Sequence, residues 1–322
     1  MPDRRRPRRH VSSCAAVAGE GAGGPHDPLP LRIYNAVTPE AGATLLRVGP
    51  RASRDGRVVT RAIKYYADGA LGSRGAALFQ PYADAPNSTG LVVFRHDEAL
   101  PVFETALRRG IQIATHAIGD RGNALTLDAY AEAFAAVPPT QRRIAAPRWR
   151  IEHAQILRPA DIPRFAQMGV IASMQPSHAI GDLYFAPARL GFDRLVGAYA
   201  WKSLIASGAI VVVGSDAPVE KGDPLIEFYA AVARRSLDGF SDEGWHPEQA
   251  VDRATALKMF TAWPAYASFS ENTRGVLKPG MAADVSVFSV DLMTAPVADI
   301  PTGHAVLTMI DGRVAWRAPP SP

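Results

Sequence analysis

Short apolar, strand-like runs recur along this sequence, and helix-like segments separate them. The helix-like segment 97–109 shows the pattern: Leu100, Phe103 and Leu107 are spaced three and four apart, and Gly110 follows in the usual C-terminal position. Strands that alternate with helices through short connections pair in parallel, with right-handed crossovers. The alternation therefore predicts an α/β fold built on a parallel sheet. The six strand candidates are 31–37, 58–66, 111–116, 149–153, 170–174 and 209–215.

Four of these runs carry a polar side chain that could bind a metal ion, at or near the carboxyl end. Lys64 lies within its run, His116 and His153 end theirs, and Asp216 follows the last one. Catalytic groups of (β/α) barrels lie at the carboxyl ends of the parallel strands. The placement predicts one active site in a TIM-type (β/α) barrel.

Each of these residues also has a structural interpretation. A histidine after an apolar run is often a buried residue with satisfied hydrogen bonds, Asp216 could be a helix N-cap, and a strand lysine normally extends outward. Two histidines in equivalent positions leave the structural interpretation and a metal site about equally supported, and imidazole and carboxylate groups suit zinc and related divalent ions. In a dry site Lys64 could lose its proton and react with carbon dioxide to form a carbamate.

Composition and charge exclude several classes of protein. The 322 residues are 47% hydrophobic and 20% charged, which suits a chain with a large core. Cys14 is the single cysteine, so no intrachain disulfide can form and a cytoplasmic location is expected. No apolar run approaches the roughly 20 residues that a membrane-spanning helix needs.

The formal net charge of +4 comes entirely from residues 1–10, which hold five arginines and one aspartate. Such a cluster can be a nucleic-acid or localisation tail, but on a neutral body it more often marks a solvated start. We therefore expect a disordered segment at 1–28 and no nucleic-acid partner. We expect the barrel domain at 29–270. The strand-like runs 284–289 and 305–316, with a hairpin turn at Asp311-Gly312, place the C-terminal strands of a small β-sandwich at 271–322.

Several motifs together resemble those of the amidohydrolase superfamily, in the branch that includes N-substituted formamide deformylases. Thr-His-Ala-Ile-Gly-Asp at 115–120, Glu-His-Ala-Gln at 152–155 and Gly-Ser-Asp-Ala-Pro-Val at 214–219 resemble the motifs of strands 5, 6 and 8. Residues 63–74 are similar to the strand 4 segment, and 275–284 with 310–314 fit the family's β-sandwich. The resemblance covers about residues 29–316.

The resemblance implies a metal-dependent hydrolase of carbon–nitrogen bonds in non-peptide amides, acting on a small N-acyl or N-formyl amine. His116 and His153 would bind one metal, carboxylated Lys64 would bridge to a second, and Asp216 would bind that second metal and transfer protons. One or two divalent ions, zinc by expectation, would be the cofactor. His178 and Arg74 are candidate substrate contacts, although a loop hydrogen bond and a solvated charge explain them equally well.

One departure from the family pattern shapes the expected fold. Members carry a His-x-His pair at the end of strand 1, and the earlier histidines here, His10 and His26, do not form it. If 31–37 corresponds to strand 3, the barrel is truncated, with strands 3 to 8 only and open edges at 31–37 and 209–215. Open edges permit homo-oligomers. The alternative to an enzyme is an inactive remnant or an interaction module, and we expect the chain to bind at most one metal tightly.

Overall fold

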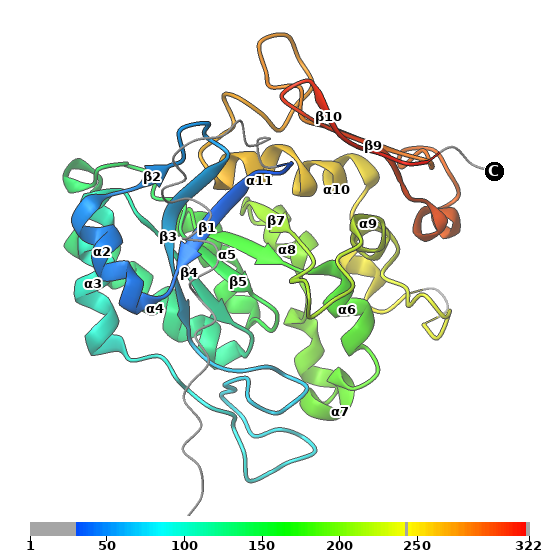
Figure 1. The fold of residues 1–322 in the computed structure, drawn as a ribbon. Coiled ribbons are helices and arrows are strands. Elements are labelled where there is room, and N and C mark those ends of the chain that lie inside the picture. Colours follow the sequence, from blue (N-terminus) through cyan, green and yellow to red (C-terminus); the bar gives the residue numbers. More distant parts are fainter. Residues whose placement is uncertain (1–29, 242–243, 320–322) are drawn as a thin grey trace, which may run out of the picture.

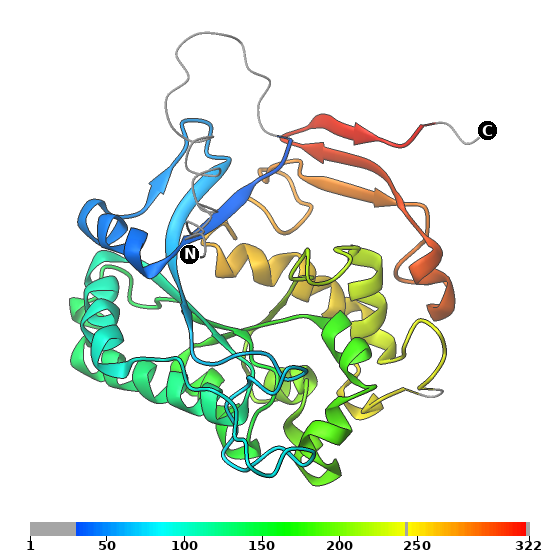
Figure 2. The ribbon, with the colours of Figure 1, turned by 60° about the horizontal axis from the view of Figure 1, so that its bottom comes forward.

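The larger of two sheets curls into about half a barrel (Figures 1 and 2). The computed structural model describes residues 30–241 and 244–319. Six strands follow one another in the order β1-β3-β4-β5-β6-β7, and all five pairings along this path are parallel. The strands are β1 (Ile33–Val37), β3 (Val58–Tyr66), β4 (Gln112–Ala117), β5 (Arg150–His153), β6 (Ile171–Met174) and β7 (Val211–Val213).

The two ends of this sheet are the ones that the sequence predicts. Within the described residues β1 pairs only with β3 and β7 pairs only with β6, so the sheet is open at both edges. The incomplete barrel is thereby confirmed. One strand was missed: β2 (Arg51–Ala52) pairs antiparallel with β3, and two exposed residues carry no periodic signal.

Helices cover the convex side of the curled sheet and continue beyond β7 (Figure 1). Gly110 ends α3 in the left-handed conformation, at φ 69°, as the sequence predicts. The main helices are α2 (Pro39–Val48), α3 (His96–Arg109), α4 (Asp120–Ala136), α5 (Ile162–Met168), α6 (Pro176–Asp182), α8 (Trp201–Ala206), α9 (Pro224–Ala233), α10 (Arg253–Phe260) and α11 (Ala262–Ala267). Over the described residues no helix is long and apolar enough to cross a membrane.

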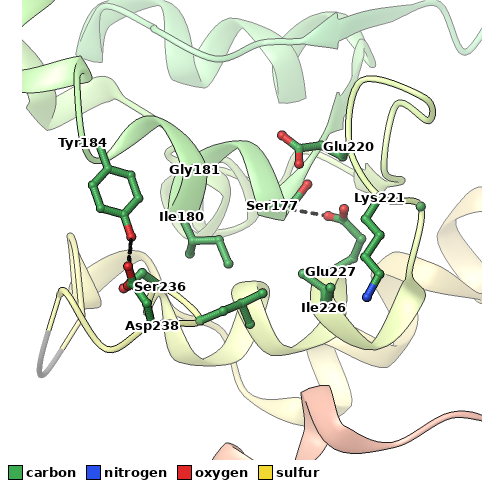
Figure 3. Close-up of a pocket in the computed structure, with 12 residues that line it drawn as sticks. Ser177, Ile180, Gly181, Tyr184, Glu220, Lys221, Ile226, Glu227, Ser236 and Asp238 are labelled. Carbon is green, nitrogen blue, oxygen red and sulfur yellow. Dashed lines mark hydrogen bonds between the residues drawn. The ribbon is translucent and has the colours of Figure 1, made fainter.

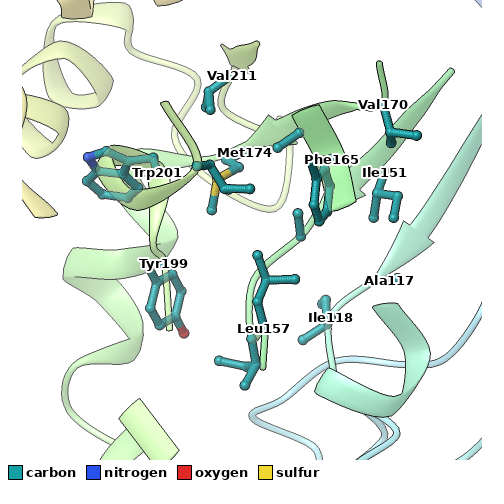
Figure 4. Packing of buried hydrophobic residues seen from close by; sticks show 14 of the residues in the cluster. Ala117, Ile118, Ile151, Leu157, Phe165, Val170, Met174, Tyr199, Trp201 and Val211 are labelled. Carbon is teal, nitrogen blue, oxygen red and sulfur yellow. The ribbon is translucent and has the colours of Figure 1, made fainter. Parts of the chain in front are cut away.

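An aromatic cluster fixes α3 and α4 against the sheet. The rings of Phe103, Tyr130 and Trp149 meet edge to face, with centroids 4.9 to 5.6 Å apart. All three side chains are fully buried, and the Trp149 indole donates to the carbonyl of Ile111. Burial of large side chains without unpaired polar groups is favourable, so this cluster orders the strands that end at the histidines. Figure 4 shows the adjoining core around β5, β6 and β7, where Phe165 and Met174 pack.

The second sheet is small and antiparallel, with the order β10-β9-β8. Its strands are β8 (Val285–Phe288), β9 (Ala305–Ile310) and β10 (Arg313–Arg317). Asp311 and Gly312 form the turn between β9 and β10 at φ 53° and 74°, the left-handed pair that a two-residue hairpin requires. Arg32, just before β1, bonds Asp284 and Asp311. The domain boundaries near residues 28 and 270 stay predictions, and the expected disordered segment 1–28 lies outside the described residues.

Candidate active site

The carboxyl ends of β3, β4 and β5 bring Lys64, His116 and His153 together. Tyr66 pairs with His116 across β3 and β4, and Lys64 lies two residues before Tyr66, so Lys64 and His116 share the concave face. On the opposite, helix-covered face, Thr115 bonds Tyr130 of α4. Strand register alone thus places two of the predicted site residues on one surface.

His153 reaches the same surface by a backbone distortion. Its register partner is Ala117, so alternation would direct the His153 side chain to the helix-covered face. The residue instead adopts φ 76°, and Ala154 follows at φ 44°. This left-handed turn brings the His153 ring to 4.5 Å from the His116 ring, centroid to centroid. Left-handed conformations are costly for residues other than glycine and cluster at functional sites.

Gln175 orients the His153 ring. Its side-chain oxygen lies 2.7 Å from Nδ1 of His153, which is buried. A proton on Nδ1, donated to Gln175, leaves a lone pair on Nε2. A metal-binding histidine is typically held in this way through its second nitrogen. On the other side of His153, the ring of His178 stacks at 5.7 Å, and its buried Nε2 makes no hydrogen bond within the described residues.

His116 has a free nitrogen at the centre of the site. Its Nε2 is buried and makes no hydrogen bond to any described residue, and a carboxylate oxygen, Oδ1 of Asp68, lies 3.5 Å away. Asp68 is occupied elsewhere, since it accepts backbone N–H groups of Ala77, Ile118 and Gly119. A buried nitrogen without a partner costs free energy. The lone pair of His116 is therefore available to a bound ion.

Lys64 lies beside a partly buried ion pair on the concave face, in which Arg150 donates to Glu152. Burial lowers the pKa of Lys64, partly offset by the charge of Glu152, while the charge of Arg150 lowers it further. Because Glu152 is bonded to Arg150, Lys64 has no carboxylate of its own among the described residues. This environment favours the neutral amine that carbamate formation requires.

Both imidazoles are held neutral. Burial, with smaller contributions from His153 and Lys64, lowers the pKa of His116 to about 3. Burial and then His178 lower the pKa of His153 to about 4. Neutral imidazole is the form that binds metal ions.

Asp216 lies in a different setting, on the exposed loop after β7. Its φ is 59°, again left-handed. Burial lowers the pKa of Lys64, His116 and His178, and the negative charge of Asp216 offsets a smaller part of that decrease in each. In residues 30–241 and 244–319, however, no three side chains of His, Cys, Asp or Glu are gathered to hold a metal ion. The side chains gathered at the strand ends could hold one ion, with His116 and His153 as its ligands and Lys64 beside them.

The structure places Arg74 in a separate ion-pair group. Its guanidinium makes two hydrogen bonds to Asp84, at 2.9 and 3.0 Å, and Asp84 also pairs with Arg189. Within the described residues, Arg74 makes no hydrogen bond or ion pair to His116, His153 or His178. Its role as a substrate contact stays a prediction.

Three residues of the site were missed from the sequence: Asp68, Glu152 and Gln175. Alternation was a usable signal for Glu152, because it pairs with His116 and so shares the concave face. Gln175 precedes α6 and its partner His153 lies 22 positions earlier, so only the fold brings them together. The three backbone N–H groups around Asp68 come from two separate loops, which no local pattern predicts.

Comparison with known proteins agrees with this arrangement. The chain is 33% identical over 255 residues to YtcJ of Bacillus subtilis, described as an amidohydrolase, and the match covers 79% of this chain and 47% of that protein. It is 27% identical to the N-substituted formamide deformylase of Arthrobacter pascens, over 78% of this chain and 44% of that enzyme. The chain thus spans less than half the length of these two relatives.

A solved structure has a similar fold over most of this chain. An uncharacterised metal-dependent hydrolase from Pyrococcus furiosus superposes with a TM-score of 0.66 at 31% identity, over 78% of this chain and 49% of that one. The sequence model of the amidohydrolase family matches residues 15–316. From its half-barrel fold, its strand-end histidines and this match over nearly its whole length, the chain belongs to the amidohydrolase family.

Proposed function

We propose that this chain takes part in the metal-dependent hydrolysis of a carbon–nitrogen bond in a small non-peptide amide. An N-acyl amine, and more narrowly an N-formyl amine, is the proposed substrate. The name of the Arthrobacter relative, an N-substituted formamide deformylase, supports the narrower choice. The family match does not favour the alternative of a noncatalytic interaction module.

One observation carries this proposal: two neutral imidazoles meet at the ends of neighbouring strands, and the Nε2 of one has no hydrogen bond to any described residue. His116 supplies that nitrogen, His153 lies 4.5 Å away ring to ring, and Gln175 holds His153 from behind. A purely structural pair would satisfy its buried nitrogens within the protein. The pair is instead arranged as metal ligands are.

The chain's own groups have distinct roles in this reaction. Asp216 accepts a proton from the water that attacks the carbonyl carbon, and then donates it to the amine nitrogen as the carbon–nitrogen bond breaks. The products are a carboxylic acid and an amine. Neutral Lys64 forms a nitrogen–carbon bond with carbon dioxide and releases a proton, and the resulting carbamate adds oxygen donors beside the histidines. His178, stacked on His153, contacts the substrate.

A divalent ion, proposed to be zinc, would act when bound as a Lewis acid that polarises the substrate carbonyl. His116 and His153 would hold it. With two histidines and Lys64 as its ligands, we expect at most one tightly bound ion per chain and slow turnover. We also propose that the protein is cytoplasmic. Copies of the chain could associate through the open edges of β1 and β7.

Metal analysis and amine release test this function together. The purified chain should bind up to one equivalent of zinc and release amine from an N-substituted formamide, and His116→Ala and His153→Ala should lose both properties. His304→Ala is the matched control, because His304 is exposed and bonds Ser289 near the small sheet. Zinc content unchanged in both alanine variants would refute the ligand assignment. Zinc binding without metal-dependent release of amine from any N-formyl or N-acyl amine would refute the hydrolase.

A further inference from the structure

A cavity of about 340 Å³ lies between α6 and α9 (Figure 3). We call it the α6–α9 pocket. Ser177 and Ile180 of α6 line one side, Ile226 and Glu227 of α9 line the other, and Glu220 lies on the loop that connects Asp216 to α9. The pocket is thus built from two helices that pack together and from the loop that carries the proposed proton donor.

This pocket adjoins the candidate active site through His178. Ser177 lines the pocket and precedes His178, whose ring stacks on His153. On the pocket side, Nε2 of His178 lies 3.8 Å from a carboxylate oxygen of Glu220. The pocket and the histidines therefore lie on the two sides of His178, so a substituent of a substrate held at the histidines would have this cavity close by.

Two of the polar groups that line the pocket are glutamates, and the buried one, Glu227, has no cationic partner among the described residues. Glu227 is 2% exposed and accepts a hydrogen bond from the backbone N–H of Ser177 at 2.9 Å. No lysine, arginine or histidine of the described residues lies within ion-pair distance of Glu227, and Lys221 at the rim pairs with neither glutamate. Burial raises the pKa of Glu227 to about 7, as expected of a carboxyl group without a counter-ion.

Three aliphatic side chains line the rest of the pocket, together with the polar Ser236 and Asp238. Ile180, Ile226 and Leu237 face the cavity, and the Tyr184 hydroxyl closes one side by bonding Asp238 (Figure 3). An apolar cavity with a carboxylate pair on one side is complementary to an alkyl chain that ends in a cation. A neutral alkyl chain of equal length would leave Glu227 without a counter-ion.

We propose that the α6–α9 pocket binds the nitrogen substituent of the substrate and selects a substituent that ends in an ammonium or a similar cationic donor. Glu227 and Glu220 bind the cation, and the three apolar side chains bind the alkyl segment. This specificity rests on the hydrolase proposed above, and it narrows the substrate class to N-formyl or N-acyl derivatives of diamines.

One matched pair of compounds tests the pocket, first by binding and then by turnover. N-formylcadaverine and N-hexylformamide differ only in whether the far end is an ammonium or a methyl group. Calorimetry at pH 8, with a chelator present to prevent turnover, should show that the chain binds N-formylcadaverine more tightly than N-hexylformamide, by on the order of tenfold. The rate of amine release by the zinc-loaded chain should show the same preference.

The variants Glu227→Gln and Glu220→Gln should each reduce this preference severalfold toward equality. Glutamine keeps the acceptor for the Ser177 N–H, so Glu227→Gln should fold, and thermal unfolding checks this. Glu98→Gln, which removes an exposed carboxylate paired with Arg95 on α3, is the control and should leave the preference unchanged.

The outcomes separate the two proposals. Equal affinity for N-formylcadaverine and N-hexylformamide, or a preference that survives both glutamine variants, refutes the pocket. Hydrolysis of both formamides at equal rates refutes the pocket and leaves the hydrolase intact. Glutamate-dependent binding of N-formylcadaverine without hydrolysis of either formamide supports the pocket and refutes the hydrolase.

Discussion

The two sides of the candidate site differ in how far the protein alone organises them. The histidine side, at the ends of β3, β4 and β5, is buried: His116 and His153 are packed ring to ring, and Gln175 and Asp68 surround them. The aspartate side, on the loop after β7, is exposed, and the Asp216 side chain makes no hydrogen bond to any residue that the structure describes. The histidine side, which would bind the ion, is therefore held by packing, whereas the aspartate side, which would transfer the proton, is exposed to solvent.

This difference indicates that the two sides can be damaged separately. Loss of a buried residue on the histidine side should change metal affinity, because the ligands are held by packing and hydrogen bonds. Loss of an exposed residue on the aspartate side should change the rate and leave metal binding and folding intact.

The largest expected effect comes from Asp216→Asn. Removal of a proton-transfer group typically costs about 10²- to 10⁴-fold in rate, and we expect amine release to fall by that order. The zinc content should stay at the wild-type level, with Asp299→Asn as an exposed control. If zinc content falls together with the rate, Asp216 is part of the ion-binding set and the separation of the two sides is wrong.

The second prediction concerns pH and the buried carboxyl of α9. The pKa of Glu227 is raised from 4.5 to about 7, so the folded state holds a proton that the unfolded state releases between these values. Its contribution to stability is full below pH 4.5 and is lost as the pH rises through 7, a decrease of roughly 3 kcal/mol. Urea unfolding of Glu227→Gln should lack this part of the pH dependence. Parallel profiles for the variant and the wild type would contradict the shift.

Gln175→Ala should have an intermediate effect, confined to the histidine side. Without its partner at Nδ1 the His153 ring is free to rotate, and zinc affinity should fall by about 10- to 100-fold. Competition with a zinc-binding dye measures this, and Gln141→Ala, an exposed glutamine after α4, is the control. Unchanged affinity would mean that packing against His116 and His178 is sufficient to orient the ring.

The smallest expected effect is that of Arg74→Ala. The ion pair with Asp84 is exposed, so its loss should change the free energy of unfolding by less than about 1 kcal/mol. If Arg74 contacts the substrate, KM should rise severalfold while zinc content stays constant. An unchanged KM would remove Arg74 from the substrate contacts.

Much of the framework was predictable because the strands are short, apolar and bounded by helices with clear ends. The run 58–66 coincides with β3, and the edge positions of β1 and β7 follow from counting strands. The positions of Lys64 and His116 on one face follow from register. These features depend on local periodicity, which a single sequence contains.

The supporting groups of the site were not predictable in the same way. Gln175 meets His153, and Asp68 meets the backbone of Ile118 and Gly119, only after the parallel strands have aligned. The α6–α9 pocket likewise forms only when these two helices, which a long stretch of chain separates, pack against each other. Contacts of this kind depend on the whole fold, and local periodicity does not describe them.

The direction of the His153 side chain was the least predictable feature. Alternation along β5 directs it toward α4, and the observed direction depends on a left-handed φ at a residue with no glycine-like signal. The cost of that conformation must be met by the surrounding fold, which a pattern of residue types does not describe.

That left-handed turn also limits how the site could be transferred to another protein. Grafting two histidines onto the ends of adjacent strands in a regular parallel sheet, at the positions of His116 and His153, would direct the rings to opposite faces. A working graft has to include the backbone of residues 153 and 154, together with the packing that stabilises it. What has to be copied is therefore a conformation as well as a pair of side chains, and a search for similar sites should compare backbone angles before it compares residue names.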